Sequence, residues 1–402
     1  MTSWKRVSLS TILQPRKTKD IPAKFPDLPY IGMEHVARDL GTIDLLGRSA
    51  EYRSSAPKVF KGDVLYGRLR PYLNKVVIAP GEAFASGEFI VLPANDAITN
   101  KFLQYRLLSQ DFVEFAGTLD TGDRPRVSWE QISKFEIDLP TLPEQLKIVE
   151  ILEDHLSRLD AALADVKQAK LKAAQFRRSL LQAAFTGNLT GDATRLMTEL
   201  PDGWAYKTLG EIAKWGSGGT PRAGTKTYYD GEIPWAIIGD LNDSYVSKTA
   251  RNITKKGLEE SSARMVPVGA VLIAMYGSIG KLGINTIPMA TNQAIAFAIP
   301  NADLVLQKYL FHYLSSQREV FLWSGKGATQ QNISQTLLKA WKIPLPPLPE
   351  QQKIVEILED HLSRLNASVA IADTMEMQSA CLRRSLLQAA FTGQLTKEVA
   401  SV

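Results

Sequence analysis

The sequence contains one long segment twice. "LPEQLKIVEILEDHLSRL" runs from Leu142 to Leu159, "LPEQQKIVEILEDHLSRL" runs from Leu348 to Leu365, and "RRSLLQAAFTG" follows in both copies, at 177–187 and 383–393. Between 143–190 and 349–396, 32 of 48 positions are identical without a gap. Solenoid repeats have periods of about 20–50 residues, whereas these copies lie 206 residues apart. The chain therefore consists of two halves, each a whole domain unit.

The part of each half that precedes the repeat has diverged. Trp4 and Leu9 correspond to Trp204 and Leu209, and "KGDVL" corresponds to "VGAVL". A chain of 402 residues with 45% hydrophobic content can bury a core in each of these parts. We predict four segments, with boundaries at 1–142 (globular), 143–190 (helical), 191–348 (globular) and 349–402 (helical).

The repeated segments are predicted to be long helices. Apolar residues recur every three or four positions, as at Ile148, Leu152 and Leu156. A helix of about 42 residues is about 63 Å long and needs a partner along its length. The obvious partner is the other copy, and an antiparallel coiled coil would relate the halves by a pseudo-twofold axis and hold the globular domains apart. Lys170 and Glu376 interrupt the apolar seam at equivalent positions.

The globular parts have the pattern of mixed α+β domains. "GDVLYGRLRPYLNKVVIA" predicts two strands around a basic turn, and "GAVLIAMYGSIGKLGIN" is its counterpart. Strands in "EFIVLP" and "AIAFAIP" follow, and then a helix in "NKFLQYRLLSQ" or "LQKYLFHYLSSQ". The predicted fold class is α+β, with two α/β globular domains separated by the paired helices.

Positive charge is concentrated in the globular parts. Residues 1–142 sum to +2 (19 basic, 17 acidic) and residues 191–348 sum to +4 (16 basic, 12 acidic), which is a mild indication of nucleic-acid binding. No apolar run reaches the 18 residues of a membrane span, and "MTSWKRVSLS" lacks the apolar core of a signal peptide. We expect a cytoplasmic protein. The single cysteine, Cys381, excludes an intramolecular disulfide, and we expect it to be buried or inert.

Two kinds of loop carry side chains suited to DNA. The turns between the paired strands and the loops before the last strand of each domain supply arginine, lysine, amide and hydroxyl groups. Arginine can hold guanine bidentately or clamp a phosphate, and residue type does not separate these roles. Glutamine and asparagine suit adenine, although a single amide often only caps a turn. The candidates are Arg68, Arg70, Tyr72, Lys75, Arg124 and Arg126 in the first domain, and Ser278, Lys281, Lys326, Thr329, Gln330, Gln331 and Asn332 in the second.

No catalytic or metal site is predicted. "GSIGKLG" resembles a phosphate loop, but Met275 replaces its first glycine and Leu282 replaces the Ser/Thr that would hold magnesium. The four histidines form no ligand cluster, because His155 and His361 are repeat equivalents and His35 and His312 lie apart. No glycine-rich S-adenosylmethionine loop or Asn-Pro-Pro-Tyr motif is present. Any chemistry must come from partners.

A spacer role for the helices explains the apolar seam but not the identity of "KIVEILEDHLSRL" outside it. Solvent-facing positions diverge unless something binds them or the duplication is recent. The diverged globular domains argue against a recent duplication, unless recombination exchanged them.

Over its full length the chain resembles the specificity subunits of type I restriction–modification systems. The resemblance rests on the twice-repeated "LPxLPEQxKIVEILEDHLSRL…RRSLLQAAFTG" and on "GSGGTP", "YYDGEIPW" and "GATQQNIS" in the second domain. The first domain departs from this pattern, with "LPYIGMEHV" and "RPRVSWEQI" in place of the last two, so its DNA contacts are transferred less directly.

The resemblance implies a non-catalytic reader of double-stranded DNA. Each globular domain would recognise one half of a bipartite, asymmetric site, and the helices would set the spacing and dock two modification subunits. Those subunits would transfer methyl groups from S-adenosylmethionine to adenine, and two restriction subunits can add ATP- and Mg²⁺-dependent translocation and cleavage. This chain would hold no cofactor itself.

Two other classes of protein remain possible interpretations of the sequence. A structural adaptor could use the paired helices to hold two protein-binding domains apart, without salt-dependent affinity for duplex DNA. A self-contained enzyme would turn over without partners, which the missing motifs disfavour.

Overall fold

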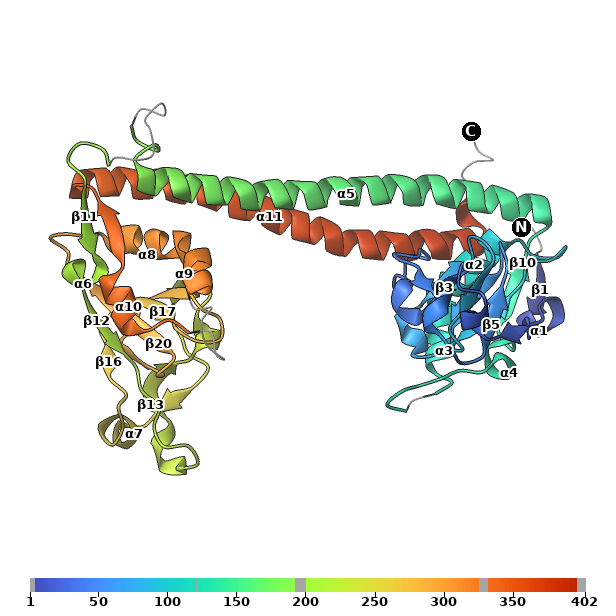
Figure 1. Ribbon diagram of the computed structural model, residues 1–402, viewed down its shortest axis with the longest axis horizontal. Helices are drawn as coiled ribbons and strands as arrows, with labels where there is room; N and C mark the ends of the chain where they lie inside the picture. The colour runs from blue at the N-terminus through green and yellow to red at the C-terminus, as the bar shows by residue number, and fades with distance from the viewer. Residues whose placement is uncertain (1–3, 121, 192–199, 325–331, 396–402) are drawn as a thin grey trace. The chain divides into compact units, whose positions relative to one another are not determined.

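The computed structural model describes residues 4–120, 122–191, 200–324 and 332–395 (Figure 1). Contacts divide the chain into two units: unit 1 comprises 1–167 and 372–402, and unit 2 comprises 168–371. Each unit contains one globular domain and parts of both long helices. These units group residues that are close in space, whereas the four predicted segments divide the chain along its sequence. The boundaries of those segments remain a prediction.

The long helices are α5 (Leu142–Thr186) and α11 (Leu348–Phe391), which run side by side (Figure 1). Both end before a glycine in the left-handed region, Gly187 at φ +81° and Gly393 at φ +73°, where an L side chain would be strained. Each begins one residue before the predicted helical segment, 143–190 or 349–402, that corresponds to it.

The two helices pair in opposite directions within each unit. In unit 1, Ile148 and Leu152 near the start of α5 share a core with Leu387 near the end of α11. In unit 2, Ala184 near the end of α5 shares a core with Ile354 near the start of α11. The predicted antiparallel pairing is confirmed.

The globular domain of unit 1 has a five-stranded sheet in the order β2-β5-β8-β3-β4, a three-stranded sheet in the order β7-β6-β9, and the pair β1-β10. Its elements are β1 (Lys5–Ser8), α1 (Leu9–Ile12), β2 (Lys19–Asp20), β3 (Pro29–Ile31), β4 (Gly47–Arg48), β5 (Ala56–Val59), β6 (Val64–Gly67), β7 (Val76–Ile78), β8 (Ala83–Ala85), β9 (Phe89–Leu92), α2 (Asn100–Leu108), α3 (Gln110–Gly117), α4 (Trp129–Ile132) and β10 (Glu136–Leu139). Strand β6 is buried on both faces, because Val64 and Tyr66 join the core that contains α2 and α3 while Leu65 joins a second core.

The globular domain of unit 2 has a related arrangement. Its sheets run β12-β20-β17-β18-β14, β15-β13-β19-β16 and β11-β21. Its elements are β11 (Ala205–Thr208), α6 (Leu209–Ile212), β12 (Ala213–Ser217), β13 (Tyr229–Ala236), β14 (Ser244–Val246), β15 (Asn252–Ile253), α7 (Lys255–Glu259), β16 (Met265–Val266), β17 (Val271–Ala274), β18 (Leu282–Asn285), β19 (Met289–Thr291), β20 (Ile295–Pro300), α8 (Gln307–Ser316), α9 (Arg318–Ser324), α10 (Gln335–Ala340) and β21 (Lys342–Leu345). The central strand β17 is again buried on both faces, with Ile273 in one core and Leu272 in another.

The predicted strand pairs and helices are present in both domains. β6 pairs antiparallel with β7, and β17 pairs antiparallel with β18. β9 and β20 occupy the predicted apolar segments, and α2 and α8 follow them as expected. Within the described residues, none of the helices combines the length and apolar character that crossing a membrane requires.

A buried glutamine fixes each globular domain to the start of its own long helix. Gln145 accepts the Thr99 N–H at 2.9 Å and donates to the carbonyls of Ala97 and Pro140. Gln351 repeats this arrangement in unit 2 with Leu306, Leu304 and Pro346. Contacts between each long helix and its own globular domain therefore explain part of the repeated sequence.

Candidate nucleic-acid interface

The two predicted loops of the first domain lie together. Leu69, in the β6–β7 turn, forms an antiparallel bridge with Arg126, in the loop before α4. The Arg70 N–H donates to the Pro125 carbonyl at 2.7 Å. Arg70 has a φ of 51°, a left-handed conformation that a non-glycine residue adopts at some energetic cost. These main-chain bonds hold the basic turn and the arginine loop as one surface.

The candidate side chains on this surface differ in what they can reach. Tyr72, Arg124 and Arg126 are exposed, whereas Arg68 and Arg70 are half-buried. Nε of Arg68 is buried without a hydrogen-bond partner among the residues that the structure describes. Lys75 donates from Nζ to the Met33 carbonyl at 2.6 Å, so its ammonium group is directed into the protein.

The second domain repeats the same junction. Tyr276, in the β17–β18 turn, forms an antiparallel bridge with Asn332, and the Ile333 N–H donates to the Met275 carbonyl at 3.0 Å. Ser278 and Asn332 are exposed and Lys281 is half-buried. Four other predicted contacts, Lys326, Thr329, Gln330 and Gln331, lie outside the described residues.

Sequence reasoning missed one charged residue at the first junction. Glu88, in the β8–β9 turn, binds the Arg126 guanidinium, with Oε1 3.0 Å from Nη2 and 3.1 Å from Nε. The two residues are 38 positions apart, so no local pattern signals their contact. The pairing depends on the sheet that brings the β8–β9 turn beside the loop.

The identical parts of the repeat come together in each unit. Unit 1 contains the first repeated segment of α5 and the last repeated segment of α11, and unit 2 contains the first of α11 and the last of α5. Five residues of the first segment that are identical in both copies and solvent-exposed in both lie on one helix face. We call these the outer faces; they are Lys147, Glu150, Asp154, Ser157 and Arg158 on α5, and Lys353, Glu356, Asp360, Ser363 and Arg364 on α11.

Beside each outer face lies a groove, of about 350 Å³ in unit 1 and about 370 Å³ in unit 2. In unit 1, Lys101 pairs with Glu153 at 2.8 Å and Arg383 pairs with Asp160. The corresponding contacts of unit 2 are Lys308–Glu359 at 2.7 Å and Arg177–Asn366 at 3.3 Å. The grooves share these contacts but differ in other lining residues: Asn366 replaces Asp160, and His312 and Phe311 replace Tyr105 and Gln104.

That histidine has an altered acidity. Burial lowers the pKa of His312 to about 4, although the nearby Glu359 acts in the opposite direction. Burial raises the pKa of Tyr105, its counterpart in unit 1, whose hydroxyl donates to Glu153 at 3.3 Å. His312 is therefore neutral near pH 7.

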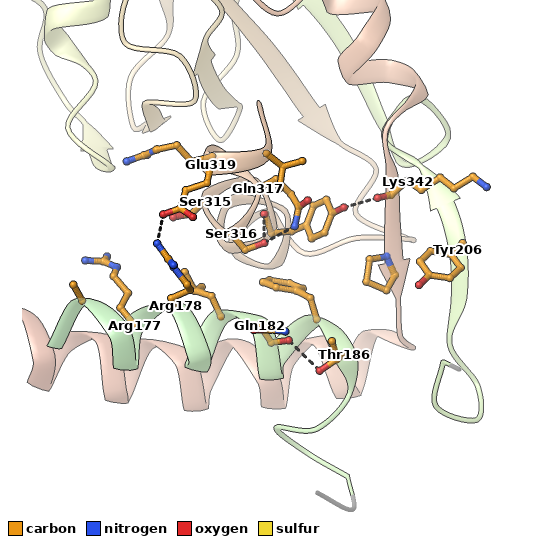
Figure 2. A pocket seen from close by; sticks show the side chains of 17 residues that line it. Arg177, Arg178, Gln182, Thr186, Tyr206, Ser315, Ser316, Gln317, Glu319 and Lys342 are labelled. Atoms are coloured by element: carbon orange, nitrogen blue, oxygen red, sulfur yellow. Dashed lines mark hydrogen bonds and ion pairs between the residues drawn. The ribbon is translucent and has the colours of Figure 1, made fainter. Parts of the chain in front are cut away.

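A cavity of about 600 Å³ lies between the end of α5 and the α8–α9 segment of unit 2 (Figure 2). Arg178 of α5 is ion-paired to Glu319 of α9 across it, and Gln182 and Thr186 line its floor. Arg177, Arg178, Gln182 and Thr186 belong to the repeated segment. In the described part of the chain, His, Cys, Asp and Glu side chains form no cluster that could hold a metal ion. Cys381 is exposed rather than buried.

The family model described as "Type I restriction modification DNA specificity domain" matches residues 1–172 and 201–371, which is most of the chain. The chain belongs to this family. The resemblance predicted from the repeat is therefore confirmed.

Several specificity subunits of type I restriction enzymes are similar in sequence. The EcoR124I/EcoR124II subunit of Escherichia coli is 30% identical over an alignment of 303 positions that covers 71% of this chain and 69% of that subunit. The HindI subunit of Haemophilus influenzae is 23% identical over an alignment covering 90% of this chain and 95% of that one. The MjaIX subunit of Methanocaldococcus jannaschii is 33% identical, but over only 40% of this chain and 38% of that subunit.

Two solved structures share the fold. A chain described under "complex assembly and conformational transition of the type I R-M system" covers 98% of this chain, with a TM-score of 0.82 and 22% identity. The HsdS subunit from Thermoanaerobacter tengcongensis also covers 98%, with a TM-score of 0.59. The predicted fold class, two mixed α/β domains with paired long helices, is confirmed.

Proposed function

We propose that this chain is the DNA-reading subunit of a type I restriction–modification complex, and that each globular domain reads one half of a bipartite, asymmetric site. The observation that carries the proposal is that each domain has an equivalent junction. At this junction a turn and a loop of polar and basic residues form one surface. The side chains at the two junctions differ: Arg126 in the first domain occupies the position that Asn332 occupies in the second. Two equivalent surfaces with different side chains suit two different half-sites.

The sequence-predicted contacts divide between the two half-sites. We assign Arg68, Arg70, Tyr72, Arg124 and Arg126 to the first, and Ser278, Lys281, Lys326, Thr329, Gln330, Gln331 and Asn332 to the second. Because the ammonium of Lys75 contacts a protein carbonyl, its contribution is to hold the turn.

Methylome sequencing tests the reading role. The chain and its modification subunit would be expressed together in a host that lacks this system. The expected result is one bipartite methylated adenine motif. An adaptor that holds protein-binding domains apart would give no methylated motif and no salt-dependent affinity for duplex DNA, and that result would exclude the proposal.

We further propose that the outer faces dock two copies of the modification subunit. One kind of partner can bind twice only to two equivalent surfaces, and the outer faces carry the same five residues in the same order. The Asp154–Arg158 and Asp360–Arg364 ion pairs, at 3.1 and 3.0 Å, are exposed and add little to helix stability. Their identity is therefore better explained by binding than by folding. Methyl transfer with S-adenosylmethionine, and any restriction step with ATP and Mg²⁺, would belong to the partner subunits.

Matched variants test this docking. D154A/R158A should remove one partner copy, D360A/R364A should remove the other, and the combined variant should bind none. Native mass spectrometry of the co-expressed proteins would report two-to-one, one-to-one and free chains. K172A, at an exposed helix position where the repeat is not identical, is the control and should keep both copies. Two bound copies on the combined variant would exclude the outer faces as the docking sites.

A further inference from the structure

Three segments meet at the DNA-facing junction of the first domain, although the sequence predicted two. The third is the β8–β9 turn. The Arg68 N–H donates to the Glu88 carbonyl at 2.8 Å, and the Val127 N–H donates to the Arg68 carbonyl at 3.1 Å. The turn containing Glu88, the basic turn and the arginine loop are thus joined through the main chain of Arg68.

At this junction the carboxylate of Glu88 holds one edge of a guanidinium. Its oxygens lie 3.0–3.2 Å from Nε and Nη2 of Arg126. A guanidinium has five N–H donors in a fixed plane, so the Nη1–Nη2 end can still bind a second group bidentately. Arg126 remains about half exposed, with a side-chain exposure of 46%. Its orientation is therefore fixed while its end stays accessible.

The charge of Glu88 argues for base reading over phosphate binding. A carboxylate beside DNA opposes the phosphates and weakens binding to any sequence. It also neutralises Arg126, so the pair gains little from a phosphate. Neither effect weakens bidentate hydrogen bonding from an oriented arginine to O6 and N7 of guanine. The pair therefore lowers the affinity for DNA of any sequence while it keeps the ability to select guanine.

The second domain has the same junction with another pair of residues. The Met275 N–H donates to the Ala294 carbonyl at 2.8 Å, as Arg68 does to Glu88, and the Tyr276–Asn332 bridge corresponds to Leu69–Arg126. Ala294 thus stands at the position of Glu88, and Asn332 at that of Arg126. An amide carries its own donor and acceptor and needs no carboxylate to orient a charge. Both positions differ together between the domains.

We propose that Glu88 and Arg126 form a specificity-determining pair, in which Glu88 positions Arg126 to read one guanine of the first half-site. The proposal rests on the reading function proposed above. Glu88 is a positioning residue, because it acts through Arg126.

The test compares E88Q with R126K, each co-expressed with the modification subunit. E88Q keeps the shape of the side chain but loses the charge that orients the guanidinium. R126K keeps the charge but loses the planar fork. Both should relax the methylated motif at the same single guanine and leave the second half-site unchanged. Discrimination against the wrong base there should fall by roughly 5- to 150-fold, the range of one bidentate contact.

E82Q is the matched control. Glu82 lies just before β8 and pairs with Lys58 at 2.7 Å, away from the junction, so this variant should keep the motif. Fluorescence anisotropy with purified complexes, on duplexes that differ at that one base, gives an independent readout. An unchanged motif in E88Q, or an equal change in affinity for all duplexes, would overturn the pair. Absence of any methylated motif with the unmodified chain would instead refute the reading function itself.

Discussion

His312 and Tyr105 occupy the same position in the two grooves but respond differently to pH. Both lie in the helix that faces the long-helix pair, and both are directed at a repeated glutamate, Glu359 or Glu153. The two side chains differ in the cost of being buried. Tyrosine is neutral at every physiological pH, whereas a protonated histidine must lose its proton to be buried. Only unit 2 therefore carries a titrating group at this position.

The stability of unit 2 should decrease in mild acid because of His312. The folded-state pKa of about 4 lies below the ordinary value of 6.5, so between these values the unfolded chain binds a proton that the folded one excludes. The contribution is fully present above pH 6.5 and is lost as the pH falls toward 4. From pH 7 to 5 the loss should be about 2 kcal/mol at 1.36 kcal/mol per unit.

H312Y, which copies the residue of unit 1, should remove that part of the pH dependence. Urea unfolding of the wild type and the variant at pH 7 and pH 5 measures it. Equal slopes of stability against pH in the two proteins would show that His312 does not titrate on unfolding.

At the scale of elements, α5 and α11 are the parts that the repeat predicted best. If their length sets the distance between the half-sites, four residues inserted after Ala164 and after Ala370 lengthen the pair by about 6 Å and turn it by roughly 40°. The unspecified spacer should then grow by one or two base pairs, since duplex DNA rises about 3.4 Å per pair. Methylome sequencing reads the new spacer directly, and the bases within each half should stay the same. An active complex with the original spacer would mean that the helices serve assembly alone.

The helices and the central strands were predictable because their apolar residues recur with a fixed period or in unbroken runs. The edge strands β2 and β4 have two residues each, which is too short for any such pattern. Gln145 and Gln351 look like ordinary surface residues of a charged helix, yet both are fully buried. Their role follows from carbonyl and amide groups of the globular domain that no helical pattern reveals.

Only part of the candidate site could likewise be predicted from the sequence. The basic turn and the arginine loop could be selected by composition, and the structure places them together. Glu88 could not be selected, because an acidic residue is not expected on a surface that binds DNA. It becomes meaningful only through its contact with Arg126.

At the scale of the whole molecule, each unit is completed by a segment from the other half of the chain. Unit 1 needs "RRSLLQAAFTG" of α11, where Leu387 and Ala390 join its core. The same eleven residues end α5, where Leu181 and Ala184 occupy the equivalent places in unit 2. The first half on its own lacks the α11 copy of this segment, which completes its core. It carries the α5 copy of the same segment, which could complete the core of a second molecule.

Residues 1–190 expressed alone should therefore form a homodimer by segment exchange, with each copy completing the core of the other. Size-exclusion chromatography with light scattering should give twice the mass of the fragment, and L181D/A184D, which places charge in that core, should give a monomer or an unfolded chain. With the modification subunit present, such a dimer should methylate a palindromic site built from the first half-site twice. Duplication and fusion of one half gene would then have freed the two domains to diverge, turning a reader of symmetric DNA into a reader of asymmetric DNA.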